Sequence, residues 1–290
     1  MLSMTFIMLP RASVSAQRVA EVLSTEPVIV DPEHPVDFDP NARGLVVFEH
    51  VYFRYPNAEA DVLYDISLTA RPGETTAIIG STGCGKSTLV NLIPRFYDVT
   101  RGRVLVNGVD VRSVRQADLR RRIGYVAQKG VLFTGTIRDN IAYGNPDATD
   151  EEIREAATIA QAIDFIEASE DGFDTEIAQG GANVSGGQKQ RLSIARALVR
   201  NPDIYIFDDA FSALDYRTDA ALRRALRQKT KDATFIIVAQ RIATIRNAEQ
   251  IIVLDEGRIA GSGRHEELMQ TCPVYREIAL SQLSEKELAI

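Results

Sequence analysis

The sequence predicts an α/β fold in which buried parallel strands end at charged or glycine-rich segments. The stretch IYIFDDAFSALD (204–215) begins with four apolar residues and continues into two acids, Asp208 and Asp209. Such an apolar run closed by acids is typical of a parallel strand whose carboxyl end supplies charge to a site. A second stretch, ETTAIIG (74–80), is an apolar strand that continues directly into a glycine-rich loop and a predicted helix.

Composition narrows the class of protein. The chain has 290 residues, of which 45% are hydrophobic and 25% charged, with a net charge of −7. These values describe an ordinary globular core, and the acidic balance argues against nucleic acid as the main partner. Cys84 and Cys272 lie far apart without CxxC spacing, so we expect free thiols in a reducing compartment. HEELM (265–269) lacks the second histidine of a zinc-protease helix.

The N-terminal segment differs from the rest of the chain. Residues 1–9, MLSMTFIML, are almost wholly apolar but too few to cross a bilayer. We expect them to be the end of a truncated transmembrane helix, with a frayed apolar terminus as the alternative. Apolar spacing by four predicts that a connecting helix continues over 11–24. A linker rich in proline and acids follows, so residues 10–43 connect to a domain over 44–290.

Short strands then lead to a phosphate-binding loop. LVVFEHVYFRY (45–55), VLYDISLTA (62–70) and ETTAIIG precede GSTGCGKST (80–88), and the predicted helix LVNLIPRFY (89–97) follows. The loop matches G-x-x-x-x-G-K-[ST] in full and in the strand-to-helix context that this motif requires. Its backbone N–H groups converge on an anion at a helix N-terminus. The residues expected to bind nucleotide here are Gly80, Ser81, Thr82, Gly83, Cys84, Gly85, Lys86, Ser87 and Thr88.

Two of these side chains, together with Asp208, are expected to have distinct roles. Lys86 reaches the outer phosphates, the Ser87 hydroxyl coordinates Mg²⁺, and Asp208 holds a water bound to that Mg²⁺. The combination predicts a nucleoside triphosphate site. We interpret Cys84 as a small residue that fits a crowded turn, although oxidation of its thiol should impede nucleotide entry.

A second anion site is predicted in NVSGGQKQRLSIARAL (183–198). Ser185, Gly186, Gly187 and Gln188 open an amphipathic helix and offer a hydroxyl and backbone N–H groups. Because one protomer already has a complete phosphate loop, this helix end is expected to bind nucleotide held by another protomer. Here the sequence resembles the nucleotide-binding domains of ATP-binding cassette (ABC) transporters, over residues 44 to about 282. VSGGQ is similar to the family signature LSGGQ.

The resemblance implies a P-loop NTPase fold, with a RecA-like core, an antiparallel β subdomain and an inserted α-helical subdomain over about 130–195. It also implies ATP and Mg²⁺ as ligands. Tyr55 resembles the aromatic that stacks on adenine, Gln128 the glutamine-loop residue that contacts Mg²⁺, and Asp215 the D-loop aspartate at a dimer interface. LFTGTIRDNIAYG (132–144) resembles exporter-type members. The family therefore implies a membrane domain N-terminal to this one and a position on the cytoplasmic face of the cell membrane.

Three residues depart from the family pattern. Asp209 stands where the family has a catalytic glutamate, and Gln240 in FIIVAQR stands where it has a switch histidine. Aspartate is one methylene shorter, and a displacement of about 1 Å at a reacting centre can cost about a hundredfold in rate. Glutamine donates a hydrogen bond but carries no imidazolium charge. Gln179 replaces a glutamate that is common in exporters.

These departures predict a degenerate site with weak hydrolysis in which Asp209, Gln240 and Gln128 are the candidate catalytic residues. The chain is then expected to complete the competent site of a non-identical ABC subunit that has the consensus glutamate and histidine. Two alternatives stay open. One is a soluble ABC-type ATP switch without a transport role, and the other is a homodimeric exporter that hydrolyses ATP slowly with aspartate and glutamine.

Overall fold

A computed structural model describes residues 2–282, and these residues form two separate units. The first unit ends at Val30 and the second begins at Asp31. Residue 1 and residues 283–290, which belong to the predicted segments 1–9 and 44–290, lie outside the described residues. Each unit is considered by itself below.

The first unit contains one helix, α1 (Leu2–Leu23), which continues through Pro10. It joins the two N-terminal segments that the sequence analysis separated at residue 9. Its apolar side chains Phe6, Ile7, Met8 and Leu9 are all exposed. No helix within residues 2–282 is long and apolar enough to cross a membrane. The assignment of 1–9 to a membrane helix therefore stays a prediction.

The predicted linker is partly attached to the second unit. The Gln116 backbone N–H donates to Asp31 Oδ1 at 2.9 Å, and the Val36 N–H donates to the Ser113 carbonyl at 2.9 Å. A short 3₁₀ turn, η1 (Pro40–Ala42), then leads into the first strand. The compact unit thus begins before the boundary that the sequence predicted at Gly44, because long-range backbone contacts, which composition does not encode, fasten this extended segment.

The first sheet of the second unit is antiparallel throughout. Its four strands lie in the order β2 (Leu63–Ala70), β1 (Val46–Phe53), β4 (Arg101–Val106) and β5 (Val109–Asp110). Val46 lies opposite Ala70 on one side and Val106 on the other, and all three are fully buried. This sheet therefore has one apolar face packed into the core.

The second sheet positions the candidate site. Its order is β12 (Arg258–Gly263), β11 (Gln250–Asp255), β3 (Thr75–Ile79), β10 (Thr234–Val238), β9 (Ile204–Asp208) and β6 (Ile123–Val126), with β12 alone antiparallel. Val238 pairs with both Ile78 and Asp208. The parallel strands thus end together, and the segments that follow them meet along one edge.

Strand β9 shows how the core is divided. Ile204 and Ile206 pack with the antiparallel sheet, whereas Tyr205 and Phe207 pack with the helices on the opposite face. Because successive side chains of a strand alternate between faces, a strand buried on both sides is apolar at every position. The continuous run IYIF follows from this position in the middle of three layers.

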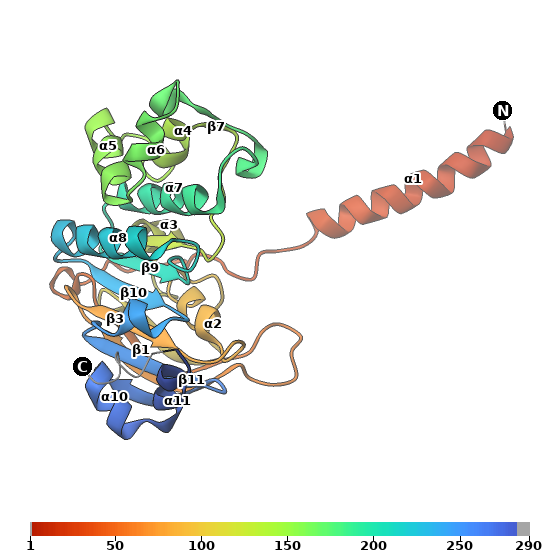
Figure 1. Cartoon of the computed structure of the whole chain (residues 1–290). Helices are drawn as coiled ribbons and strands as arrows, with labels where there is room; N and C mark the ends of the chain where they lie inside the picture. Colours follow the sequence, from red (N-terminus) through yellow and green to blue (C-terminus); the bar gives the residue numbers. More distant parts are fainter. Residues whose placement is uncertain (1, 283–290) are drawn as a thin grey trace. The chain divides into compact units, whose positions relative to one another are not determined.

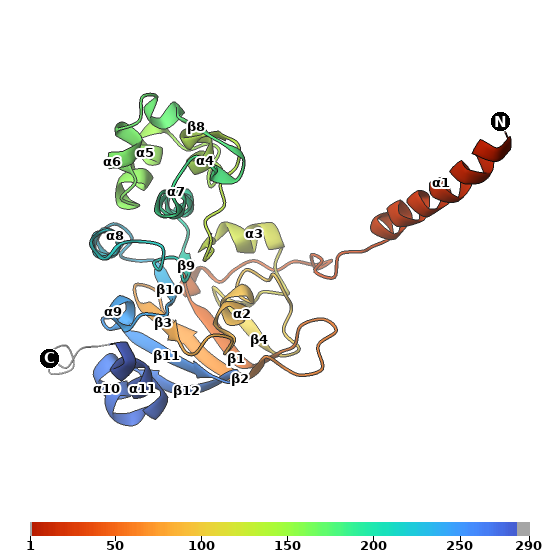
Figure 2. The same ribbon diagram turned by 45° about the vertical axis from the view of Figure 1, so that its right-hand side comes forward.

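Helices cover the second face of the parallel sheet. In chain order the second unit contains α2 (Lys86–Asn91), α3 (Gln116–Arg121), α4 (Ile137–Ala142), α5 (Asp150–Ile159), α6 (Ile163–Glu167), α7 (Gly186–Leu198), α8 (Tyr216–Lys229), α9 (Ile242–Ile245), α10 (His265–Thr271) and α11 (Pro273–Gln282). Helices α4, α5 and α6 gather on the far side of α7 from the sheets (Figures 1 and 2).

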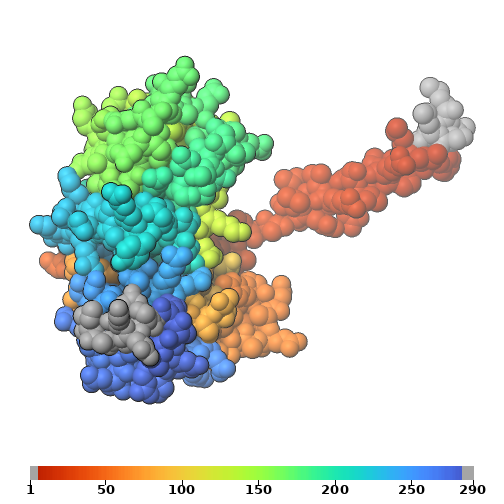
Figure 3. All heavy atoms as spheres, in the orientation of Figure 1, coloured from red at the N-terminus to blue at the C-terminus, as the bar shows by residue number. Residues whose placement is uncertain are grey.

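The strands β7 (Gly135–Thr136) and β8 (Glu176–Ile177) pair beside these helices. In Figure 3 this helical part, in green, forms the upper end of the unit. The helical subdomain expected over about 130–195 stays a prediction.

Candidate nucleotide-binding site

The glycine-rich loop lies between β3 and α2, at the carboxyl edge of the parallel sheet. A Cβ atom at Gly80 would lie 2.0 Å from the Leu254 carbonyl oxygen and 2.7 Å from Cys84 Sγ. Gly85 precedes α2 with a left-handed φ of 102°. The loop can pass this closely only without side chains at these positions. The first N–H groups of α2 have no partner within the helix, which leaves them available to an anion.

Lys86 lies across its own loop. Its Nζ donates to the carbonyl oxygens of Gly80 at 2.8 Å and Ser81 at 2.7 Å. Cys84, which is buried, has its Sγ 3.8 Å from the same amine. The lysine charge is thus held at the hollow of the loop, where a phosphate would lie.

Asp208 and Ser87 bring oxygen ligands together. The Ser87 hydroxyl donates to Asp208 Oδ1 at 2.9 Å, and the Tyr125 hydroxyl approaches Oδ2 at 3.3 Å. Burial raises the pKa of Asp208, and the charge of Asp209 adds to this effect, while the hydrogen bonds from Ser87 and Tyr125 oppose it. A nearby cation would stabilise this carboxylate in its charged form.

Asp209 forms the centre of a three-residue cluster. Its Oδ2 accepts a hydrogen bond from Gln128 Nε2 at 2.9 Å and another from Gln240 Nε2 at 2.7 Å. The carboxylate is buried, and the backbone of Asp209 has a left-handed φ of 50°. Two of the three residues that depart from the family pattern, Asp209 and Gln240, therefore contact each other directly.

Tyr55 is anchored beside the loop. Its hydroxyl is 2.9 Å from Thr88 Oγ1, and its ring packs edge-on against Phe53 and Tyr97 with centroids 4.8 Å and 5.2 Å away. The ring is half-buried. Its role in base stacking stays a prediction.

A cavity of about 360 Å³ brings most of the predicted residues together. The site residues predicted from the sequence that line this cavity are Tyr55, Thr82, Gly83, Gly85, Lys86, Ser87, Thr88, Gln128, Asp208, Asp209 and Gln240. Val62 and Val238, which were not predicted, also line it. Gly80, Ser81 and Cys84 belong to the loop but do not line the cavity.

The predicted second anion site lies elsewhere. Ser185, Gly186, Gly187 and Gln188 do not line the cavity. Ser185 caps α7, and its backbone N–H donates to Gln188 Oε1 at 2.9 Å in a capping box. A Cβ at Gly186 would meet no heavy atom within 4 Å. This helix end therefore faces open space on its own chain.

The remaining predicted residues have local structural roles. The Asp215 carboxylate caps α8 by accepting the Thr218 N–H at 3.0 Å. The hydrogen bonds from the Thr218 hydroxyl and from this N–H lower the pKa of Asp215. Gln179 is exposed in a short 3₁₀ turn.

Sequence reasoning missed Gln190 and Tyr125. Gln190 is 1% exposed, accepts the Gly130 N–H at 3.0 Å and donates to the Ala127 carbonyl at 3.1 Å, so it fastens the loop around Gln128 to α7. The signal was available, since Gln190 lies on the apolar side of an amphipathic helix. Tyr125 looked like one more apolar strand residue, and only the fold brings its hydroxyl to Asp208.

Replacing Gly80 by alanine should destabilise the loop. The new Cβ would collide with the Leu254 carbonyl, and overpacking of this kind costs about 1–3 kcal/mol. We expect a corresponding loss of unfolding free energy in chemical denaturation, together with weaker nucleotide binding. Gly83→Ala is the matched control, since its Cβ meets no atom within 4 Å and only its φ of 84° opposes it at about 1 kcal/mol. Equal stability of the two variants would contradict the steric argument.

Fold and site together define a P-loop nucleoside triphosphatase. Residues 63–212 match the family model described as ABC transporter. The chain therefore belongs to the ABC transporter family, and its domain is an ABC-type ATP hydrolase that binds ATP.

Similar proteins agree with this assignment. An "Uncharacterized ABC transporter ATP-binding protein" of Mycobacterium tuberculosis is 53% identical over 97% of this chain and 49% of its own length. The Bacillus subtilis protein named "Putative multidrug export ATP-binding/permease protein YgaD" is 43% identical over 93% of this chain and 46% of its own. A solved structure of a bacterial Atm1-family ABC exporter with ATP bound matches with a TM-score of 0.89 and 37% identity, covering 98% of this chain and 49% of that one. The chain thus spans about half the length of the curated relatives it matches.

Proposed function

We propose that this chain is the ATP-binding half of an ABC exporter subunit, joined to an N-terminal membrane domain and acting on the cytoplasmic face of the cell membrane. Relatives named as export ATP-binding/permease proteins, about twice as long as the matched region, support this proposal. Residues 1–9 would then be the end of the last membrane helix, in keeping with the exposed side chains from Phe6 to Leu9.

The nucleotide site is proposed to bind ATP together with Mg²⁺. Lys86 and the loop N–H groups face the phosphates, and Tyr55 faces the base. Ser87, Asp208 and Gln128 offer the oxygen ligands that Mg²⁺ prefers. Within residues 2–282, no cluster of three metal-binding acids, histidines or cysteines exists, which fits a cation held jointly with substrate phosphates. Such a cation would neutralise charge that develops on the phosphates.

The nucleotide site is further proposed to be degenerate. The observation that carries this proposal is the pair of hydrogen bonds from Gln128 and Gln240 to Asp209 Oδ2. A general base must accept a proton from the attacking water within hydrogen-bond reach. Here two amide donors already occupy Oδ2, one of the two carboxylate oxygens able to accept it, and aspartate extends one methylene less than glutamate. The arrangement favours retention of nucleotide over its hydrolysis.

The exposed helix end at Ser185–Gln188 supports a crossed dimer. The capping box uses the N–H groups of Ser185 and Gln188. The Gly186 and Gly187 N–H groups take no part in it, so they are available to the γ-phosphate held by a partner subunit. A non-identical partner with glutamate and histidine at the positions of Asp209 and Gln240 would then provide the phosphate loop and the catalytic residues of the competent site. On this proposal the chain has a phosphate-loop site that hydrolyses ATP weakly, whereas its VSGGQ segment is intact.

Restoring the consensus residues tests the proposed degeneracy. Wild-type protein should hydrolyse ATP very slowly. Where two copies of the chain pair with each other, Asp209→Glu combined with Gln240→His should raise steady-state turnover about tenfold or more, because the carboxylate is longer and no longer contacts the Gln240 amide. Adding Lys86→Ala to this double variant is the control, and it should remove the gained activity. Affinity for a fluorescent ATP analogue should stay unchanged in the double variant.

A brisk wild-type rate that Asp209→Ala abolishes would contradict degeneracy. It would instead favour the homodimeric exporter in which aspartate suffices as the base.

A further inference from the structure

A second cavity, of about 500 Å³, lies at the opposite edge of the parallel sheet. Asp203 immediately precedes β9 and Arg122 immediately precedes β6. The nucleotide-site residues Asp208 and Gln128 lie at or beyond the other ends of the same strands. A strand rises about 3.3 Å per residue, so the length of β9, roughly 16 Å, separates the two cavities. The second cavity is therefore no part of the nucleotide site on this chain.

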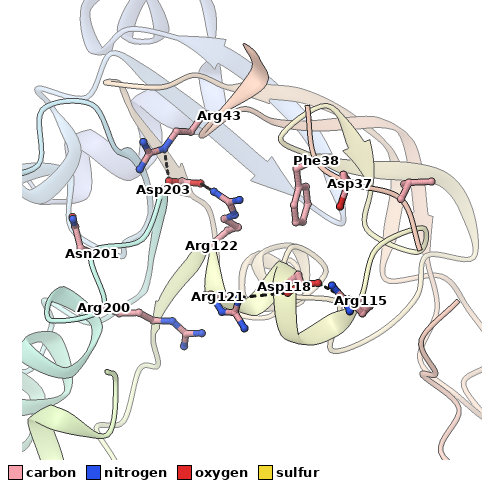
Figure 4. A pocket seen from close by; sticks show the side chains of 11 residues that line it. Asp37, Phe38, Arg43, Arg115, Asp118, Arg121, Arg122, Arg200, Asn201 and Asp203 are labelled. Carbon is pink, nitrogen blue, oxygen red and sulfur yellow. Dashed lines mark hydrogen bonds and ion pairs between the residues drawn. The ribbon is translucent and has the colours of Figure 1, made fainter. Parts of the chain in front are cut away.

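Arginines dominate the lining of this cavity (Figure 4). Its charged lining residues are Arg43, Arg115, Arg121, Arg122 and Arg200, with Asp37, Asp118 and Asp203. Five guanidinium groups thus face three carboxylates, which leaves an excess of positive charge.

One side of the cavity is a fixed scaffold around Asp203. This buried carboxylate accepts hydrogen bonds from Arg43 Nε at 2.6 Å, Arg122 at 3.1 Å and Asn107 Nδ2 at 3.3 Å. The negative charge of Asp203 is therefore balanced by the two arginines among these donors. On the other side, Asp118 accepts from Arg115 Nε at 2.6 Å.

Arg121 and Arg200 are the arginines of this lining whose charge is least balanced. Arg121 lies 3.6 Å from Asp118, which is already bonded to Arg115. Within residues 2–282, no carboxylate lies within ion-pair distance of Arg200, and its guanidinium donates no hydrogen bond. Burial lowers the pKa of Arg200, and the like charge of Arg121 lowers it further. Figure 4 shows both guanidinium groups directed into the same open space.

Two neighbouring guanidinium groups without a shared acceptor repel each other, and an anion between them removes that cost. Each planar guanidinium group can donate two parallel hydrogen bonds to a phosphate or a carboxylate. A phosphate group has several oxygens and up to two negative charges, so it can accept hydrogen bonds from both guanidinium groups at once.

We propose that Arg121 and Arg200 form a binding site for a phosphate group, remote from the nucleotide cavity. The group belongs to a free phosphate compound or to the headgroup of an anionic phospholipid. This inference does not depend on the proposed transport function, since it rests on the charges and geometry of residues outside the nucleotide site.

Two double variants of the full chain test the site. Arg121→Gln with Arg200→Gln removes the two guanidinium charges of the proposed site, and Arg264→Gln with Arg276→Gln removes two exposed charges elsewhere. With saturating ADP and Mg²⁺ in the nucleotide site, inorganic phosphate should raise the melting temperature of wild-type protein and of the control. The cavity variant should need at least about tenfold more phosphate for the same shift. Low ionic strength keeps the interaction unscreened.

Vesicles distinguish the two sources of phosphate. Wild type and both variants are sedimented with phosphatidylcholine vesicles that contain or lack phosphatidic acid. Binding that requires phosphatidic acid and is lost only in the cavity variant identifies a lipid headgroup, whereas a response to inorganic phosphate alone identifies a soluble compound. The proposal is overturned if both double variants behave alike with both probes. It is also overturned if the cavity binds an acidic peptide and neither phosphate probe. An unchanged melting temperature of the cavity variant without phosphate shows that it folds.

Discussion

Lys86→Ala is expected to reduce affinity for a fluorescent ATP analogue by at least about a hundredfold. The Nζ atom lies at the hollow of the loop, 2.8 Å from the Gly80 carbonyl and 2.7 Å from the Ser81 carbonyl. In the bound state this amine would exchange the neutral carbonyls for charged phosphate oxygens, which form much stronger hydrogen bonds. Alanine leaves several negative charges facing the loop without their cation.

Loss of the two carbonyl contacts also removes support from the loop, so folding is measured separately. Lys231→Ala, at an exposed turn, is the matched control for removal of one lysine. Both variants should unfold at similar denaturant concentrations, and only Lys86→Ala should lose nucleotide. Unchanged affinity in a folded Lys86→Ala protein would refute the assignment of this cavity to nucleotide.

Changes in the signature segment are expected to eliminate ATP turnover in the assembled transporter. Ser185→Arg or Gly187→Asp should lower the steady-state ATPase rate in reconstituted membranes by about a hundredfold or more, because a preorganised donor to developing charge contributes about 3–4 kcal/mol in comparable sites. Asp209→Ala in the same chain should reduce the rate far less, since its own site contributes little chemistry.

The structure supplies controls for this comparison. Ser185 caps α7, and loss of an N-cap costs about 1 kcal/mol, so Ser185→Asn keeps the cap while replacing the hydroxyl. A Cβ at Gly187 would meet only the Ala213 carbonyl, at an ordinary 3.5 Å, so Gly187→Ala should leave the isolated domain stable. If Asp209→Ala proves more harmful than the signature variants, this chain is a working catalytic subunit.

Local patterns were sufficient to predict the phosphate loop and the strand before Asp208. The loop conformation depends on glycines within a few residues of one another, and Gly80 and Gly85 have the close approach and the left-handed φ that the motif requires. The strand β9 is continuously apolar because both of its faces are buried. Each of these features depends on neighbours in the sequence, so it can be recognised without the fold.

The sequence by itself thus determined the α/β class, the phosphate loop, the acids at the end of β9 and the family. Only the tertiary structure decided that Gln128 and Gln240, which lie 81 and 31 residues from Asp209, donate to the same carboxylate oxygen. It also decided that Arg200 lies within reach of the like charge of Arg121 and, among the described residues, has no carboxylate of its own. Such pairings arise from the alignment of strand ends and helices over long sequence separations, and no local spacing encodes them.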